Sequence, residues 1–321
     1  MKVFTITNMW PYARKIYYGI FVKEQVEALN AYFPEIENKT WFLRGYLGKV
    51  LYLTSIVSLN IHLFFHRYDV IHIHSALSGI FLLFGPKRSN VIITLHGTEV
   101  LDDRQYRISK HVIRKVNTLV CVSREIEDKV LLEYPDARTC VIPCAVRESF
   151  FNDNRIKSGE HVTIAFASAS WREVKNYPLF MEVIDLLRSM YPQREIRTAE
   201  FDNQTREEIR ETLNTIDLLL VTSFHEGSPQ IVKEALCCNV PVVSANVGSV
   251  KQMLDGLLNC AVVDGYNAAD YAAAVADILF RDGVSFPVRS DGRKRIHDLQ
   301  YDEKTITAKI MKLYRDAILP N

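Results

Sequence analysis

Residues 222–238 read Thr-Ser-Phe-His-Glu-Gly-Ser-Pro-Gln-Ile-Val-Lys-Glu-Ala-Leu-Cys-Cys. The apolar run Leu218–Thr222 leads into this stretch and predicts a buried strand that ends at Thr222. Ser228 is a favourable helix N-cap and Pro229 suits the first helical position, so the pattern predicts a helix over 229–238. Glu226 and Gly227 then lie in a strand-to-helix turn, which is typical of a parallel sheet.

The same alternation of strand and helix runs along the whole chain. Amphipathic patterns such as Gly19–Asn30 and Tyr177–Met190 predict helices between short, β-branched apolar runs. Strands that are apolar on both faces indicate parallel sheets covered on both sides. The predicted strands are Val3–Thr7, Val70–His74, Val91–Leu95, Leu119–Val122, Cys140–Ile142, Val162–Ala167, Leu218–Thr222, Val240–Ser244 and Ala261–Val263. We therefore expect an α/β fold with two Rossmann-like, doubly wound domains that face a cleft.

Chain length and composition set the domain count and the compartment. At 321 residues the chain exceeds the size of one core, so two domains are expected, residues 1–150 and 151–321, with the polar segment 147–160 as linker. No run approaches the roughly 18 apolar residues of a membrane span, and we expect no signal peptide. The six cysteines include no C-x-x-C pair, so we expect them to be reduced, as in a cytoplasmic protein.

The turn at 226–229 has the chemistry of an anion site. Backbone N–H groups at a helix start attract an anion such as a diphosphate, and Gly227 removes a side chain where a ligand approaches the backbone. Glu234 lies roughly 8 Å beyond Pro229 along the predicted helix. Glu226 and Glu234 could therefore hold hydroxyls at both ends of a nucleotide-sugar. The alternative is that both are ordinary surface carboxylates.

This segment resembles the Glu-x7-Glu signature of the retaining GT-B glycosyltransferases of family four. The similarity extends from the Asn8–Gln25 segment to the C-terminal helix and is weakest at residues 31–68. The resemblance implies that Glu226 contacts the donor sugar and Glu234 the ribose. The remaining residues of the implied donor-binding segment are Gly227, Ser228, Pro229, Gln230 and Ile231.

A second motif, residues 167–178, follows the first strand of the second half. Arg172 and Lys175 there could both reach a diphosphate, whose charge grows as the glycosidic bond breaks. The family places an Arg further upstream and a Gly directly after the Lys. Here Ser170 stands at the Arg position and Asn176 replaces the Gly. We expect Lys175 and Arg172 to be catalytic, and the alternative is a solvated charged turn.

Two further features of the first half match the family. His96, in Thr-Leu-His-Gly-Thr-Glu, ends a predicted strand and could hydrogen-bond a sugar hydroxyl or a phosphate oxygen. A single histidine is usually structural, and the resemblance is what makes His96 a catalytic candidate. The loop between Thr7 and Gly19 resembles the family's glycine-containing loop over the acceptor and the donor phosphate, so Gly19 is a donor-binding candidate, although a pair of glycines is common there.

Other cofactor and metal chemistry lacks sequence support. There is no G-x-G-x-x-G and no G-x-x-x-x-G-K-[ST], so no redox cofactor or ATP hydrolysis is predicted. There is also no D-x-D, so we predict that the diphosphate is held by a helix end and basic side chains, without metal. His72 and His74 point to one face of a strand and could bind a metal, but no third ligand is evident, and we expect a structural role or a place in the wall of the cleft.

The distribution of charged and aromatic residues is compatible with membrane contact but does not require it. Residues 1–150 hold 19 Lys and Arg against 14 Asp and Glu, whereas residues 151–321 hold 20 against 24. A basic first half favours an anionic membrane surface, and ordinary surface variation is the alternative. Residues 39–68 suit a membrane interface, a lipid-linked acceptor or equally a buried helix. They mix Trp41, Phe42, Tyr46, Tyr52, Phe64 and Phe65 with Lys39, Arg44, Lys49 and Arg67.

These patterns together favour a retaining sugar transferase. The donor would be a UDP-, GDP- or ADP-sugar, itself a substrate, and no further cofactor is expected. The acceptor would be a glycan or lipid-linked molecule in bacterial surface-polysaccharide assembly, at the cytoplasmic face of the inner membrane, and no nucleic acid is involved. The alternatives are a nucleotide-sugar epimerase of the same fold and a non-catalytic nucleotide-sugar-binding partner subunit.

The final helix has an implied part in this arrangement. Residues 302–318 carry an apolar stripe that includes Ile306, Ile310 and Tyr314. In GT-B folds the last helix returns to the first domain, so we expect this stripe to tie the two domains together. The alternative is that it completes the core of the second domain.

Overall fold

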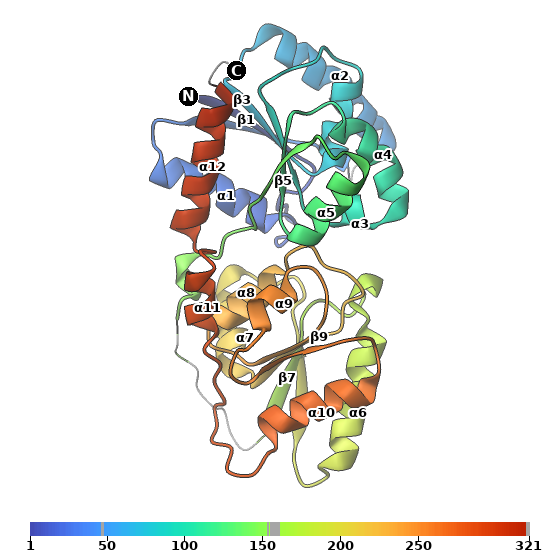
Figure 1. Ribbon diagram of the computed structural model, residues 1–321, viewed down its shortest axis with the longest axis vertical. Helices are drawn as coiled ribbons and strands as arrows, with labels where there is room; N and C mark the ends of the chain where they lie inside the picture. Colours follow the sequence, from blue (N-terminus) through green and yellow to red (C-terminus); the bar gives the residue numbers. More distant parts are fainter. Residues whose placement is uncertain (46–47, 153, 155–160, 319–321) are drawn as a thin grey trace. The chain divides into compact units, whose positions relative to one another are not determined.

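The computed structural model describes residues 1–45, 48–152, 154 and 161–318. The chain forms two compact units (Figure 1): Met1–Ala145 with the C-terminal segment from Glu303, and Val146–Asp302. The division at Ala145 falls before the expected residue 150, because Val146 donates its N–H to the carbonyl of Tyr301 and Phe150 is buried in the core of the second unit. Of the predicted linker, residues 153 and 155–160 lie outside the described residues.

The first unit is built on a six-stranded sheet in the order β2-β1-β3-β4-β5-β6, and every pairing is parallel. Successive strands are added on one side of β1 and then on the other, so the direction in which the sheet grows reverses between β1 and β3. Alternate residues of each strand face opposite sides, so Phe4 and Ile71 enter one core while Val3 and Val70 enter the other. The strands are β1 (Lys2–Thr7), β2 (Glu37–Phe42), β3 (Val70–His74), β4 (Val91–Leu95), β5 (Thr118–Cys121) and β6 (Arg138–Val141).

Helices cover both faces of this sheet. The helical elements of the unit are α1 (Ile20–Tyr32), α2 (Lys49–Phe65), η2 (Ala76–Leu83), α3 (Thr98–Leu101), α4 (Asp103–Ile113), α5 (Arg124–Glu133) and α12 (Glu303–Ile318). Helix α12 runs beside α1 (Figure 1). Its Ile306, Ile310 and Tyr314 are buried in the core that also contains Val3 of the sheet.

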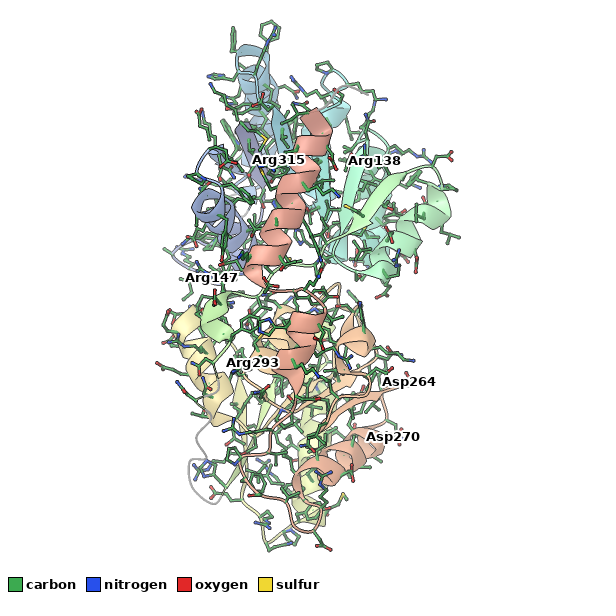
Figure 2. All side chains as sticks on the ribbon, turned by 60° about the vertical axis from the view of Figure 1, so that its left-hand side comes forward. Arg138, Arg147, Asp264, Asp270, Arg293 and Arg315 are labelled. Carbon is green, nitrogen blue, oxygen red and sulfur yellow. The ribbon has the colours of Figure 1, made fainter. Side chains whose placement is uncertain are left out.

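The predicted apolar stripe of the final helix therefore completes the core of the first unit, and not that of the second. Arg315, labelled on α12 in Figure 2, adds an ion pair with Glu35 at 3.7 Å and lies over the ring of Phe33. Because these partners all belong to the first unit, α12 is part of the structure of that unit.

The second unit is a five-stranded parallel sheet in the order β11-β10-β9-β7-β8. Its order reverses between β7 and β9. The strands are β7 (Val162–Phe166), β8 (Ile196–Glu200), β9 (Leu218–Val221), β10 (Val242–Ala245) and β11 (Cys260–Val263). The helical elements are η3 (Glu148–Phe150), η4 (Glu173–Lys175), α6 (Tyr177–Met190), α7 (Arg206–Thr215), α8 (Gln230–Cys237), α9 (Val250–Leu254), α10 (Ala268–Leu279) and α11 (Gly292–Asp298).

Both sheets confirm the predicted parallel α/β architecture. The two strands that the apolar patterns missed, β2 and β8, are edge strands of mostly half-buried or exposed residues. The six cysteines, all among the described residues, form no disulfide bond with one another. Within the described ranges, no helix combines the length and the apolar character needed to cross a bilayer.

Candidate functional site

The candidate site lies where the strand order of the second sheet reverses. In open parallel sheets, ligands bind beyond the carboxyl ends of the strands at such a reversal. The loops after β7 and β9 meet there: the Thr222 hydroxyl donates to the carbonyls of Lys175 and Asn176, at 2.9 and 3.0 Å. This brings the two motifs predicted from the sequence, residues 167–178 and 222–238, to one place.

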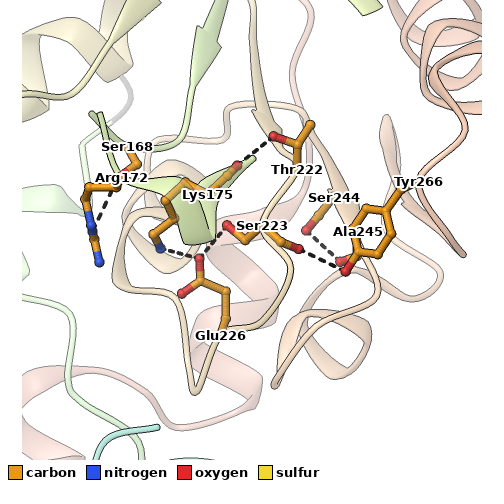
Figure 3. Close-up of polar contacts among 9 residues, drawn as sticks. All are labelled: Ser168, Arg172, Lys175, Thr222, Ser223, Glu226, Ser244, Ala245 and Tyr266. Carbon is orange, nitrogen blue, oxygen red and sulfur yellow. Dashed lines mark hydrogen bonds and ion pairs between the residues drawn. The ribbon is translucent and has the colours of Figure 1, made fainter. Parts of the chain in front are cut away.

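The centre of the site is an ion pair between Lys175 and Glu226 (Figure 3). The same carboxylate oxygen, Oε1, accepts a hydrogen bond from the Ser223 hydroxyl at 2.7 Å. Both charged side chains are largely buried, with exposed fractions of 10% for Lys175 and 13% for Glu226. Burial alone would raise the pKa of Glu226, but the Lys175 ammonium, the Ser223 hydroxyl and the Arg172 charge together hold it below its ordinary value. Glu226 is therefore an anion at neutral pH.

Arg172 lies beside this pair and is exposed. Its guanidinium donates to the Ser168 hydroxyl at 3.3 Å, as Figure 3 shows. The structure thus places Arg172 and Lys175 on one loop, although the family pattern has the Arg further upstream. An exposed guanidinium next to a buried ammonium is suited to hold an anion that arrives from solvent.

Asn176 explains the departure from the family's Lys-Gly pair. Its backbone is left-handed, with φ 55° and ψ 53°, and it precedes the first residue of α6. Glycine adopts this conformation without strain, and asparagine is among the few other residues that tolerate it. The replacement therefore keeps the turn that presents Lys175.

The turn after β9 differs from the prediction at one residue. Helix α8 begins at Gln230, so Pro229 is its N-cap and the Ser228 side chain does not cap it. The Ser228 hydroxyl instead accepts a hydrogen bond from Ser249 at 3.0 Å. Proline is disfavoured within the helix by its missing N–H but is compatible with this half-in position. Ile231, in the first turn of α8, packs against the core.

Gly248, in the loop after β10, is a supporting residue that the sequence did not reveal. Its φ is +55°, and a Cβ atom there would lie 2.4 Å from the Gly227 carbonyl oxygen and 2.7 Å from that of Glu226. Only glycine lets the loop after β10 press against the Glu226–Gly227 backbone. Together with Ser249, it fixes the position of the turn that carries Glu226.

Glu234 is the fifth residue of α8 and is almost completely buried. Its Oε1 accepts a bond from Arg206 of α7 at 2.5 Å, and the Arg206 guanidinium lies 4.5 Å from the centre of the Phe150 ring. Glu234 is therefore not the surface carboxylate of the alternative interpretation. Sequence reasoning missed Arg206, because this residue lies 28 positions from Glu234 and no motif links the two.

In the first unit, His96 follows β4 and is half-buried. Its Nε2 lies 3.1 Å from Nδ1 of His74, its Nδ1 lies 3.8 Å from the Cys144 thiol, and its backbone N–H donates to Glu99 at 2.9 Å. Burial is the main reason that the pKa of His74 lies well below its ordinary value. His96 thus lies at the carboxyl end of β4, as predicted, and contacts with His74, Cys144 and Glu99 hold it there.

His72 has a structural role, in agreement with the expectation. Its ring nitrogens contact the Tyr314 hydroxyl at 2.6 Å and the Thr94 hydroxyl at 2.7 Å. In the part of the chain that the structure describes, no group of three or more His, Cys, Asp or Glu side chains could hold a metal ion. Gly19 precedes α1 at φ +66°, and a Cβ there would overlap the Met9 backbone at 2.3 Å, so packing alone accounts for this glycine.

Comparison with known proteins shows which families the two halves of the chain resemble. The family model described as Glycosyltransferase Family 4 matches residues 24–150, and that described as Glycosyl transferases group 1 matches residues 192–283. The chain is 32% identical over 79 residues to D-inositol 3-phosphate glycosyltransferase of Mycolicibacterium smegmatis, which covers 25% of this chain and only 18% of that relative. It is 21% identical over 296 residues to N-acetyl-alpha-D-glucosaminyl L-malate synthase of Bacillus anthracis, covering 78% of this chain and 75% of the relative.

Solved structures share the fold over the full chain. A sucrose-phosphate synthase of Thermosynechococcus elongatus superposes with a TM-score of 0.74 at 16% identity and covers 98% of both chains. Anabaena HepE in complex with UDP superposes at 0.67 and 12% identity, covering 98% of this chain and 100% of that one. Two glycosyltransferase family models match, one in each half of the chain, and the solved structures share the GT-B fold over its full length. The chain belongs to the family 4 glycosyltransferases of the GT-B fold.

Proposed function

We propose that this protein transfers a sugar from a nucleotide-sugar donor to an acceptor hydroxyl with retention of the anomeric configuration. The observation that carries the proposal is the buried Lys175–Glu226 pair beside the first turn of α8, at the reversal of the second sheet. A nucleotide-sugar presents the two chemistries that this site offers partners for, a diphosphate and sugar hydroxyls. Anabaena HepE, which shares the fold, was solved with UDP and glucose and with UDP-glucose.

The site residues suit the charges that develop in such a transfer. As the bond between the anomeric carbon and the diphosphate oxygen breaks, the electron pair stays on the diphosphate, and Lys175 and Arg172 stabilise the added charge. The ionised Glu226 carboxylate accepts hydroxyl hydrogen bonds and favours an oxocarbenium-like sugar. The acceptor oxygen bonds to the anomeric carbon on the face that the diphosphate leaves, and the departing phosphate oxygen takes the acceptor proton.

Glu234 would bind the ribose in this proposal. Its carboxylate already accepts from Arg206, and a carboxylate has further lone pairs for two ribose hydroxyls. Because Glu234 is buried, Arg206 would set its orientation before the donor arrives. His96 would contact the transferred sugar or a phosphate oxygen, and Gly19 would lie in the loop over the donor phosphate.

We further propose a glycan or lipid-linked acceptor and a role in surface-polysaccharide assembly at the cytoplasmic face of a membrane. The excess of basic residues in positions 1–150 supports a location near an anionic surface. We also propose that the reaction needs no divalent metal, because the start of α8 and the side chains of Arg172 and Lys175 would bind the diphosphate.

A donor screen followed by a transfer assay tests the proposal. UDP-, GDP- and ADP-sugars are compared by thermal shift, because a ligand that binds the folded state raises its melting temperature. The best donor is then incubated with and without acceptors. Transfer, or slow donor hydrolysis with release of nucleoside diphosphate, supports the proposal. Conversion of the donor sugar without an acceptor would instead indicate an epimerase, and binding without any turnover would indicate a partner subunit.

A further inference from the structure

Helix α2 of the first unit is apolar on both of its faces. Ile56, Leu59 and Leu63 pack into the core of the unit. On the opposite side, large apolar side chains recur at helical spacing and stand in solvent, and Phe64 is 80% exposed. The exposed residues are Val50, Leu51, Leu53, Val57, Ile61, Phe64 and Phe65. An ordinary surface helix carries charged or polar residues on that side.

The few polar groups on this exposed face bond to the helix itself. Residues 50–65 include no charged side chain. The hydroxyls of Thr54 and Ser55 donate to the carbonyl of Leu51, at 3.0 and 2.7 Å, and that of Ser58 donates to the carbonyl of Thr54 at 2.9 Å. Such internally paired hydroxyls need no water, so this face can enter hydrocarbon without leaving a donor unsatisfied.

The carboxyl-terminal end of α2 broadens this surface. Phe64 and Phe65 line an open apolar groove of about 340 Å³ together with Phe84 and Pro86. Arg88 lies at the same groove and donates to the carbonyl of Leu63 at 3.1 Å, so its charge is held at the end of the helix. Phe84 is 74% exposed, like its neighbours on α2.

Basic residues stand at the carboxyl-terminal end of this surface. Arg67 follows the last residue of α2 by two positions, Lys87 follows Pro86 of the groove, and Arg88 lines the groove itself. These three residues form the basic rim of the surface. An anionic lipid surface complements such a rim, and each basic residue near it contributes attraction. A second copy of the chain would not, because a two-fold interface brings the same basic rim of each copy together.

We propose that the exposed face of α2, with Phe84, is the surface through which this protein lies on an anionic bilayer. The helix lies in the plane of the interface, Phe64, Phe65 and Phe84 enter the boundary between headgroups and acyl chains, and the basic rim contacts the headgroup phosphates. This names the surface and the lipid charge for the membrane location proposed above, and it does not depend on the sugar transfer.

The test uses the full chain and vesicles of phosphatidylcholine with or without phosphatidylglycerol, separated by flotation. The wild type should float with the anionic vesicles and only weakly with the neutral ones. Phe64→Ser combined with Phe65→Ser should lower the partition coefficient on anionic vesicles by at least about tenfold, because two aromatic side chains no longer leave water. Arg67→Gln combined with Lys87→Gln should weaken binding and reduce its salt dependence.

A matched control tests whether vesicle binding depends on this surface or on any exposed apolar side chain. Leu132, on α5 of the same unit, is 84% exposed and lies outside α2. Leu132→Ser should bind vesicles like the wild type. The proposal is overturned if the wild type does not bind, if the phenylalanine variant binds equally well, or if Leu132→Ser loses binding to the same extent.

A second outcome concerns self-association. Light scattering after gel filtration should show a monomer in the absence of lipid. A dimer that the phenylalanine variant dissociates, with no vesicle binding by the wild type, would show that a second copy covers this face and would overturn the proposal. The rise in melting temperature on adding the donor measures donor binding by the second unit, and it should be equal in all variants. A failure of the proposed sugar transfer can therefore be distinguished from a failure of the proposed membrane contact.

Discussion

The hydroxyl of Tyr314, on the final helix, lies 2.6 Å from Nδ1 of His72, on β3 of the first sheet, across 242 positions of sequence. Both side chains are buried, and the other His72 nitrogen contacts Thr94 on β4. The bond therefore joins the C-terminal helix to two strands at the centre of the first sheet. It shows that the first unit is complete only when the last residues of the chain have folded onto it.

Tyr314→Phe should destabilise the first unit. The substitution removes one hydrogen bond and leaves a buried nitrogen of His72 unpaired, which together cost about 1–3 kcal/mol. Hydrogen exchange followed by mass spectrometry should show faster exchange in α12 and β3, with the second unit unchanged. Tyr271→Phe is the matched control, since the buried Tyr271 hydroxyl donates to Gly265 in the second unit.

Removal of all residues after Gln300 should unfold the first unit, and a first unit that stays folded would contradict the role of α12.

The stability of the first unit should fall as the pH is lowered from 7 to 5. Burial lowers the pKa of His72 to about 3, whereas an unfolded histidine titrates near 6.5. Between these values the unfolded chain binds a proton that the folded chain does not, so acid favours unfolding by about 1.4 kcal/mol per pH unit for this residue. Urea titrations should show a shallower pH dependence for His72→Gln and an unchanged one for the exposed His111→Gln. If the free energy of unfolding depended on pH equally in the wild type, His72→Gln and His111→Gln, His72 would not be the source of the acid sensitivity.

Lys175→Ala should slow the proposed transfer more than it weakens donor binding. Its ammonium stabilises charge that appears on the diphosphate only as the bond breaks, so we expect a loss of about 10²–10³ in kcat and a smaller change in donor Kd. The variant also leaves Glu226 buried without its cation, which raises the pKa of Glu226 and moves the acid limb of the pH–rate profile to higher pH. The exposed Lys251→Ala serves as control. Wild-type turnover of Lys175→Ala would remove this residue from the mechanism.

Gly248→Ala should impair the site without unfolding the second unit. The added Cβ would overlap the Gly227 carbonyl oxygen and displace the turn that carries Glu226. Gly256→Ala is a matched control, because Gly256 also has a positive φ, of +70°, but nothing within 4 Å of the added carbon. Both variants carry similar backbone strain, so donor affinity measured by calorimetry should fall only for Gly248→Ala. A similar loss of affinity in both would show that strain, and not contact with the turn, is responsible.

Transfer should persist in the presence of EDTA. The sequence has no D-x-D, and the expected diphosphate site is made of a helix start with Lys175 and Arg172. The measurement compares initial rates with EDTA and with added magnesium or manganese. Activity that EDTA abolishes and that only a divalent cation restores would show that the diphosphate is bound through metal.

The sequence by itself determined the central strands and the two loops that make the site. Strands such as Val70–His74 and Val91–Leu95 were predicted at their observed bounds, because residues buried on both faces leave a continuous apolar run. The motifs around Lys175 and Glu226 were also evident, since polar residues directly after a buried strand stand out locally. The edge strands β2 and β8 were not, because their sequences ENKTWF and IRTAE are mostly polar and their residues are mostly half-buried or exposed, whereas the edge strand β11, with the sequence CAVV, kept an apolar run.

Only the tertiary structure decided what these residues contact. The Lys175–Glu226 pair arises because β7 and β9 are neighbours although β8 lies between them in sequence. The partners Arg206 of Glu234, Gly248 of the Glu226 turn and Tyr314 of His72 carry no local signal, since each acts through a contact with a distant segment. The exposed face of α2 was also decided by the tertiary structure. The sequence of α2 is apolar on both sides of the helix, and only the packing of the unit shows which side the core covers and which side stays in solvent.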